Sequence, residues 1–353
     1  MMPDKRFRTT TAAAAAAILA LLVVLAGYGL RSATEGPAAG KARESAQDGP
    51  RASLAEPDPD AQPLTYDVEY PGIGYSTTAP SDRVADLMRR LESGEARLAL
   101  GEERGWLDSL LRELDIAPDS QVLVFSATSL QTGSIRASSP RAIYFNDDTY
   151  VAWVQGGGPI EIASMDPKLG PVFYTLTQAE GADFERQTGR CLRCHDSVSL
   201  SGGGVPRFIV GSGYIGTRGN IVAHEGWILT SSRTPLRSRW GGWYVTGRHG
   251  DQVHLGNIVV RNVADLQEID ELRIGNIDDL DGLVDTSPYA SGGSDIVALL
   301  VLQHQIDVQN EIARVNFELR GGGDGSSAAA DVAGVVEPLV EAMLCVGEVG
   351  LTD

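Results

Sequence analysis

Cysteine, methionine and positive charge are all scarce in this chain. Only 3 of its 353 residues are cysteine, which is too few for a disulfide-stabilised scaffold. Lys and Arg number 29 against 47 Asp and Glu, so the formal net charge is −18. Such an acidic chain has few cations to neutralise phosphates, and we expect no nucleic-acid partner. Hydrophobic residues make up 42%, which is enough for a large core and excludes a wholly disordered protein.

The N-terminus carries a long uncharged stretch. Lys5, Arg6 and Arg8 precede an apolar run over residues 9–30, and about 20 apolar residues cross a ~30 Å hydrocarbon core as a helix. Basic residues keep their side of such a helix in the cytoplasm. We therefore expect residues 1–30 to be an inner-membrane anchor, with the rest of the chain facing the periplasm. The alternative is a cleaved signal peptide, which would release the chain into the periplasm.

The next part of the chain divides by composition and periodicity. Residues 31–66 are rich in Pro, Ala, Gly, Ser and acidic residues, which is typical of a disordered linker. Helical spacing follows, first over 84–91 with Ser81 or Asp82 as cap, and then over 106–114. Short β-branched and aromatic runs then alternate with turn residues, which predicts antiparallel hairpins. The strands expected there are 122–125, 142–145, 150–154 and 172–176.

The second half of the chain returns from strands to helices. Residues 240–245 and 253–260 read as strands, joined by a turn at 248–251. A long helix is expected over 295–320, capped by Ser294 or Asp295, and another over 330–347. The expected fold class is α+β, with helices flanking a mostly antiparallel β-rich middle. The expected organisation is an anchor or signal segment (1–30), a linker (31–66), an α+β domain (67–320), and a Gly-rich linker with a C-terminal helix (321–353).

One pentapeptide carries specific chemistry. Residues 191–195 read Cys-Leu-Arg-Cys-His, the C-x-x-C-H attachment sequence for c-type haem. Two thiols three residues apart on a helical turn can reach the two vinyl groups at one porphyrin edge, and the adjacent imidazole then lies under the iron. We predict one covalent haem c held by Cys191 and Cys194, with His195 as the proximal iron ligand. Thioether formation needs an exported chain and a haem maturation machinery, which agrees with the N-terminus.

Other interpretations of the two cysteines remain open. A redox dithiol usually lies where a strand runs into a helix of a βαβ unit, whereas this motif precedes a Ser/Gly loop. A structural zinc site needs four ligands, and no second C-x-x-C exists to supply them. A disulfide between Cys191 and Cys194 is the third alternative. Cys345 has no evident partner and is expected to be a small buried hydrophobe.

The second axial ligand would decide what the haem does. No methionine lies between 195 and 343, and Met165 precedes the motif in an expected loop, so a methionine ligand has little support. Among the histidines we favour His254 as the distal ligand, then His249, then His304. Two histidine ligands would saturate the iron and suit electron transfer. An open site would bind peroxide, NO or O₂.

Several stretches of this sequence, taken together, resemble a known group of proteins. Residues 140–157, 166–170, 191–195, 239–257 and 295–320 together resemble a group of largely uncharacterised bacterial exported proteins described as cytochrome c domain-containing. The resemblance covers about residues 120–320 and implies haem binding through Cys191, Cys194 and His195, but no substrate. Members of the group continue past the equivalent of residues 348–353 into a further helical region, which favours a truncated or frameshifted C-terminus here.

Together these features predict a membrane-anchored or periplasmic mono-haem c-type cytochrome that exchanges electrons with an unknown redox partner protein. One alternative is a peroxidase-like haem oxidoreductase, with Arg248 and His249 or His254 as proton donor and charge stabiliser. Another is a haem-based ligand sensor. Both alternatives need an open distal face on the iron.

Overall fold

The computed structural model describes residues 68–351, apart from positions 180, 223–225, 270–272, 274 and 322–331. Within these ranges no helix has the length and apolar content needed to cross a membrane. The expected membrane segment 1–30 and the linker 31–66 lie outside the described residues, so both stay predictions. The described part confirms an α+β fold, with a mostly antiparallel sheet in the middle and helices at its C-terminal end.

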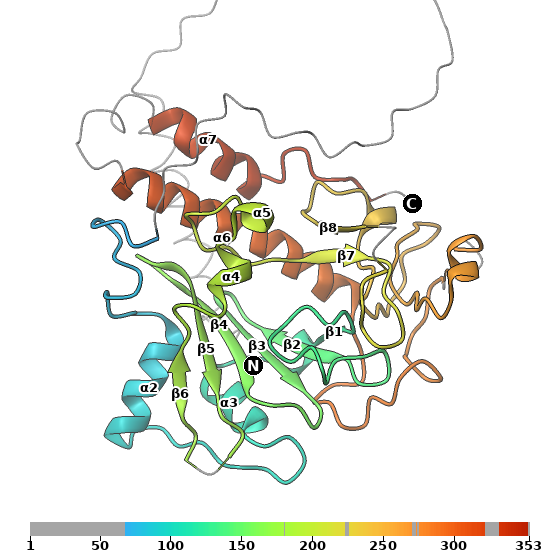
Figure 1. Cartoon of the computed structure of the whole chain (residues 1–353), viewed down its shortest axis with the longest axis horizontal. Helices are drawn as coiled ribbons and strands as arrows, with labels where there is room; N and C mark the ends of the chain where they lie inside the picture. The colour runs from blue at the N-terminus through green and yellow to red at the C-terminus, as the bar shows by residue number, and fades with distance from the viewer. Residues whose placement is uncertain are drawn as a thin grey trace, which may run out of the picture. The chain divides into compact units, whose positions relative to one another are not determined.

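A six-stranded antiparallel sheet forms the centre of the fold, and each strand pairs with the next one along the chain (Figure 1). Its strands are β1 (Val122–Val124), β2 (Arg141–Phe145), β3 (Thr149–Val154), β4 (Ile160–Asp166), β5 (Gly170–Leu176) and β6 (Phe184–Arg186). The four expected strand runs are confirmed. β4 and β6 are additional strands, and β4 shows strict alternation between buried and half-buried positions. The turn at 166–170 joins β4 to β5, as expected.

Helices α2 (Arg83–Ser93) and α3 (Leu107–Glu113) confirm the two early helices, and 3₁₀ turn η1 (Pro118–Ser120) leads into β1. Asp82 caps α2, because its carboxylate accepts the backbone N–H of Val84 at 2.8 Å. Tyr174 on β5 donates its hydroxyl to the same carboxylate at 2.5 Å, which ties the helix to the sheet. Ser81 instead donates to Asp166. A first core joins these helices to one face of the sheet, and its members include Leu87, Leu107, Leu110, Tyr144, Val151 and Trp153.

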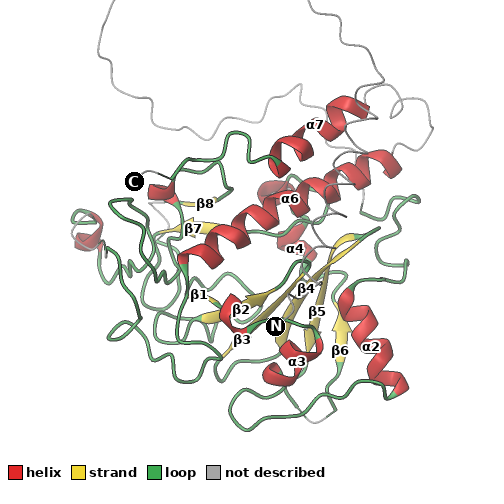
Figure 2. Ribbon diagram, turned by 180° about the vertical axis from the view of Figure 1, so that it is seen from behind, coloured by secondary structure: helices red, strands yellow, loops and turns green. Residues whose placement is uncertain are grey.

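The opposite face of the sheet is covered by α6 (Ile296–Gly321), which confirms the long expected helix. Asp295 caps it by accepting the N–H of Val297 at 2.7 Å. A second core joins the helix to this face, with Phe145, Tyr150, Phe173, Leu299, Leu302 and Ile306 among its members. Figures 1 and 2 both show α7 (Val332–Met343) running beside α6 on the side away from the sheet. Helix α7 has no buried residue of its own.

The region 202–295 differs from its expected form. The hairpin of 240–245 with 253–260 is absent there, and the strands described in this region are the short pair β7 (Gly211–Gly213) and β8 (Trp227–Leu229). The other described residues of this region form turns, loops and two 3₁₀ turns, η2 (Leu236–Ser238) and η3 (Val263–Leu266). The two segments do lie together, but Asn257 bonds both backbone groups of Val245 through its side-chain amide. The backbone N–H of Asn257 also donates to the carbonyl of Trp243 at 2.9 Å. Asn257 has a left-handed backbone with φ 68°, and its side chain makes two of the contacts that a regular strand ladder would make.

Candidate functional site

The C-x-x-C-H residues form one short helix on the sheet face that α6 also covers. Cys191 precedes α4 (Leu192–His195), and its carbonyl accepts the backbone N–H groups of Cys194 at 3.1 Å and His195 at 3.0 Å. Residues three and four apart on a helical turn point to one side. The fold therefore presents the two thiols and the imidazole from a single turn, followed by α5 (Val198–Ser201) and glycines 202–204.

Both thiols are free, and their surroundings differ. Cys191 is half-buried and packs with Leu192 against the second core, whereas Cys194 is exposed. Burial, reinforced by the negative charge of Glu161, raises the pKa of the Cys191 thiol to about 12. Cys191 is therefore a protonated thiol at neutral pH. No disulfide joins the two residues, so the expected alternative of a 191–194 disulfide finds no support in the structure.

His195 is held in one tautomer by its neighbours. Its Nδ1 lies 2.7 Å from the carbonyl oxygen of Arg207, and the backbone N–H of Arg207 donates to the carbonyl of His195 at 2.9 Å. A carbonyl oxygen can only accept, so Nδ1 carries the proton and the lone pair lies on Nε2. Burial, followed by the positive charge of Arg141, lowers the pKa of His195 to about 4. The ring packs on Phe173 of β5, with centroids 4.4 Å apart. At neutral pH it is a neutral imidazole with a fixed acceptor nitrogen.

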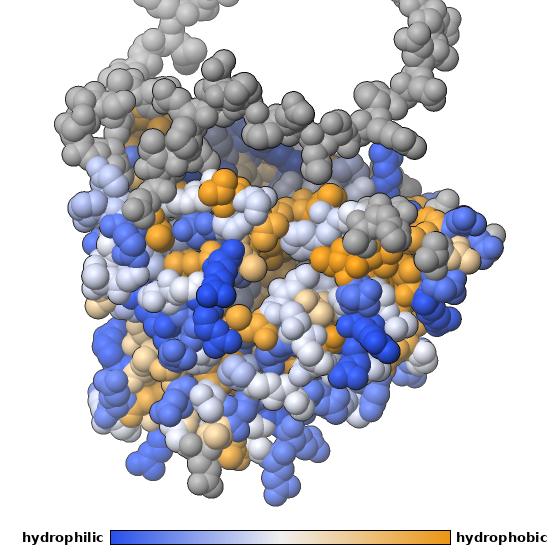
Figure 3. Space-filling view, viewed as in Figure 1, coloured by the Kyte–Doolittle hydropathy of each residue, from blue (hydrophilic) through white to orange (hydrophobic). Residues whose placement is uncertain are grey.

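A charged pair lies on the same sheet face as the motif. Arg141 on β2 and Glu161 on β4 form an ion pair of 3.2 Å with little exposure of either side chain. The Nε of Arg141 and the Oε1 of Glu161 are buried without a hydrogen-bond partner among the described residues. Beside them Ile143 and Ala163 are only partly buried, although both lie on inner strands of the sheet. Figure 3 shows the surface hollowed in this part of the molecule, beside α4, with apolar side chains at its border.

The structure places His249 and His254 together, away from α4. Their ring centroids are 4.7 Å apart, and His254 also meets Trp240 edge-on at 5.5 Å. The segment that follows Trp240 runs along the free edge of β1, where Tyr244 donates its N–H to Leu123. Three strands separate β1 from β5, where His195 packs, and strands are spaced by about 4.8 Å. No ring contact joins either histidine to His195 within the described part.

The protonation of His254 also disfavours iron binding. The backbone N–H of Gly256 donates to Nδ1 of His254 at 3.0 Å, so Nδ1 holds the lone pair and Nε2 holds the proton. Its Nε2 is buried and unpartnered, as are both ring nitrogens of His249. Burial, then the nearby positive charges of His249 and Arg273, lowers the pKa of His254 to about 4. His254 therefore presents an N–H donor where an iron ligand needs a lone pair. The prediction that His254 is the distal ligand therefore gains no support. The prediction of His249 as the second candidate gains none either, because its ring lies beside that of His254.

Three further residues named in the sequence have positions or contacts that the sequence did not predict. Met165 belongs to strand β4 and not to a loop, and it packs against the same core as Cys191. His304 is on α6 as expected, but it bonds Glu348 in the C-terminal segment. The expectation that Cys345 is buried is wrong, because the residue is exposed just after α7. Its position there follows from the packing of α7 on α6, which no local pattern around Cys345 encodes.

Comparison of the chain with protein-family models, with curated proteins and with solved structures finds no match. The function therefore has to be argued from the residues and their geometry.

Proposed function

We propose that this protein is an exported mono-haem c-type cytochrome that transfers electrons. Cys191 and Cys194 would hold the haem through thioether bonds, and His195 would bind its iron. When bound, the haem supplies one iron centre that changes its charge by a single electron. The residues of this chain fix the tautomer of the ligand, cover one side of the site with Phe173, and keep charges close to it.

The observation that carries the proposal is the hydrogen bond between Nδ1 of His195 and the carbonyl of Arg207. Histidines that bind metals almost always donate their second ring N–H to a carbonyl, a carboxylate or water, which fixes the ring and makes the other nitrogen a better ligand. The structure has this arrangement next to two free thiols with haem-attachment spacing. A redox dithiol or a zinc pair would not require the adjacent imidazole to be fixed in this way.

The surroundings of α4 suit a large apolar cofactor with acidic groups. The hollow beside α4 has apolar borders (Figure 3), and porphyrin faces are apolar. Haem also carries two carboxylates, which need cations or donors if they are covered. Arg141 is a mostly covered cation close enough for its charge to act on His195, and its Nε has no partner. These features support the fit, and Arg141 is the residue that we assign to a haem carboxylate.

The second candidate is a haem enzyme or ligand sensor with an open iron position. One observation favours it: among the described residues no ring contact joins His195 to His249 or His254. Met165 is the candidate ligand that shares an apolar core with α4. A methionine ligand would retain the electron-transfer role, and an open position would favour the enzyme or the sensor.

Haem attachment is tested by expressing the full chain with a cytochrome c maturation system. We expect one haem per chain, covalently bound, in a pyridine haemochrome assay and by intact mass. The Cys191→Ala/Cys194→Ala double variant should lose the covalent haem, whereas Cys345→Ala, the same change at the third cysteine, should keep it. Colourless wild-type protein with alkylatable thiols at 191 and 194 would overturn the proposal.

The role is tested by adding CO to the reduced haem protein. A saturated iron leaves the spectrum unchanged and supports electron transfer. Rapid CO binding supports the open-site candidate, and peroxide turnover then selects the enzyme over the sensor. Met165→Leu, which keeps the volume and removes the sulfur, should open the site to CO if Met165 is the ligand.

A further inference from the structure

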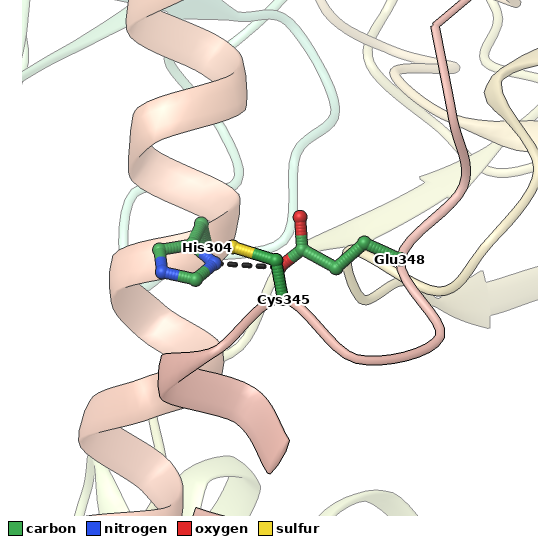
Figure 4. A group of neighbouring side chains, drawn as sticks. All are labelled: His304, Cys345 and Glu348. Carbon is green, nitrogen blue, oxygen red and sulfur yellow. Dashed lines mark hydrogen bonds and ion pairs between the residues drawn. The ribbon is translucent and has the colours of Figure 1, made fainter. Parts of the chain in front are cut away.

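A second group of metal-binding side chains lies far from the C-x-x-C-H motif in sequence. His304 projects from the middle of α6, and Cys345 and Glu348 follow the end of α7 (Figure 4). One ligand atom from each of the three lies within 4.8 Å of the others. Nδ1 of His304 faces Oε1 of Glu348 at 2.6 Å. Imidazole nitrogen, thiolate sulfur and carboxylate oxygen are the three donor types that zinc takes from proteins.

The distances are close to those of a tetrahedral zinc site. Bonds of about 2.0–2.3 Å from one ion place its ligand atoms roughly 3.3–3.6 Å apart. The 2.6 Å distance between Nδ1 of His304 and Oε1 of Glu348 would have to lengthen slightly. The Sγ of Cys345, now within 4.8 Å of both atoms, would have to lie about 3.3–3.6 Å from them. Side-chain rotation alone can make such changes, because Cys345 is exposed and the other two side chains are about a quarter to a third exposed.

The backbone already aims the thiol in this direction. Cys345 adopts a left-handed conformation with φ 57°, at a helix end where glycine is the usual residue. Its N–H donates to Ala342, and the next N–H donates to Glu341 at 2.9 Å. The chain then turns back so that Val349 bonds Ser232 at 3.2 Å. Cys345 and Glu348 are thereby both placed on the same side of α6.

The C-terminal part is only partly packed against the rest of the described domain. Helix α7 buries none of its residues, and Leu344 and Val346 after it are exposed. Among the contacts of α7, Arg314 of α6 donates to the carbonyl of Val335 at 2.8 Å. Arg233 and Glu341 form an exposed ion pair, and such pairs contribute little. A metal ion joining α6 to the segment after α7 would add a direct link between them.

We propose that His304, Cys345 and Glu348 bind one zinc ion, with the fourth position open to water. A hollow of about 250 Å³ lined by Glu348, Val346, Ala342 and Asp307 adjoins the site and gives that position access to solvent. On binding, the Cys345 thiol loses its proton to the solvent. Nδ1 of the neutral His304 ring binds the ion through its lone pair, with the single ring proton carried on Nε2 instead of Nδ1. The proposal does not depend on haem attachment.

The test measures binding of Zn²⁺ alone to the full chain by competition with a chromophoric chelator. We expect one strong site, and Co²⁺ in its place should show thiolate-to-metal charge transfer in the near ultraviolet. Zn²⁺ should also slow amide hydrogen exchange over residues 340–349. Cys345→Ala and His304→Ala should each weaken zinc binding at least about 100-fold. Glu348→Gln, which can still accept from His304, should weaken it as well.

Matched variants separate this site from the C-x-x-C-H motif. Cys194→Ala makes the same change at the other exposed cysteine, and His249→Ala removes a histidine outside the cluster; both should keep zinc affinity within about twofold. Absence of a strong zinc site in the wild-type chain would overturn the proposal. Loss of zinc binding in Cys194→Ala with retention in Cys345→Ala would overturn it too, because the ion would then be held by the motif.

Discussion

Two halves of the described domain are stabilised in different ways. In the sheet, residues 122–186, strand ladders pair the backbone groups, and side chains pack into the two cores. In the loop region, residues 202–295, side chains often pair the backbone. Arg239 donates to the carbonyls of Ser232 and Thr234, and Ser212 accepts the N–H of Gly241 at 2.8 Å. We therefore expect the sheet to tolerate changes in its polar side chains better than the loop region does.

The comparison bears on function because the motif helix α4 lies at the junction of the two halves. Phe173 from the sheet packs against the ring of His195. The carbonyl of Arg207, just before the loop region's first strand, accepts a hydrogen bond from the Nδ1–H of that ring. Any change that loosens the loop region should therefore affect the orientation of His195. The following predictions test how separate the two halves are.

The largest effect is expected for Trp240→Ala. Trp240 belongs to the loop region, is the largest fully buried side chain among the described residues, and shares a core with residues of α6. Its removal should cost about 3–5 kcal/mol in the free energy of unfolding, measured by denaturant titration. Amide exchange should accelerate more over 211–257 than over β3–β5. Trp153→Ala, the counterpart in the sheet, should accelerate amide exchange in both the sheet and the loop region. The same distribution of faster exchange in both variants would contradict the difference between the two regions.

A smaller loss is expected for Asn257→Ala. The change leaves the buried N–H and carbonyl of Val245 without their partner, and it places alanine at a positive φ. Together these should cost about 2–4 kcal/mol. Thr149→Val in the sheet also removes a buried hydroxyl contact, to Ser164 at 3.0 Å, but leaves the ladder intact. We expect Thr149→Val to lower the free energy of unfolding by about 1 kcal/mol or less. A loss of stability as large as that of Asn257→Ala would contradict the difference between the sheet and the loop region.

The third prediction concerns pH. Burial holds the pKa of His254 at about 4, below its value near 6.5 in the unfolded chain. As the pH falls from 6.5 to 4, the unfolded chain binds a proton that the folded protein does not, so this histidine makes stability fall by up to about 1.4 kcal/mol per pH unit. His254→Gln should flatten the stability–pH curve over this range, measured by urea titration at several pH values. Unchanged slopes would show that the His254 ring is not buried in its neutral form.

The smallest effect is expected at the surface of the loop region. Arg248 and Asp278 form an ion pair of 2.9 Å, with both side chains largely exposed. Water and salt screen such pairs, so Arg248→Ala should change stability by no more than about 1 kcal/mol, and less at high ionic strength. A larger loss would mean that this turn contributes more to the region than its exposure indicates.

Local patterns were sufficient for the regular half of the fold. The cap at Asp82, the β-branched and aromatic runs of β2 and β3, and the turn at 166–170 depend on neighbours in sequence, so they could be predicted. The hairpin over 240–260 could not, because Asn257 replaces a ladder through a side-chain contact that only the tertiary packing creates. At the site, the spacing of Cys191, Cys194 and His195 could be recognised in the sequence. The hydrogen bond between His195 and Arg207 could not be predicted, because it joins residues twelve positions apart.

The sequence alone determined the acidic charge, the early and late helices with four strands of the sheet, and one turn that carries two thiols and an imidazole, because each depends on composition or on residues a few positions apart. Only the tertiary structure decided which ring nitrogen of His195 and of His254 holds a proton, that the ring of His254 contacts that of His249, and that Cys345 lies near His304. These depend on contacts between segments 40 or more residues apart or on the folded course of a loop, and no local periodicity encodes them.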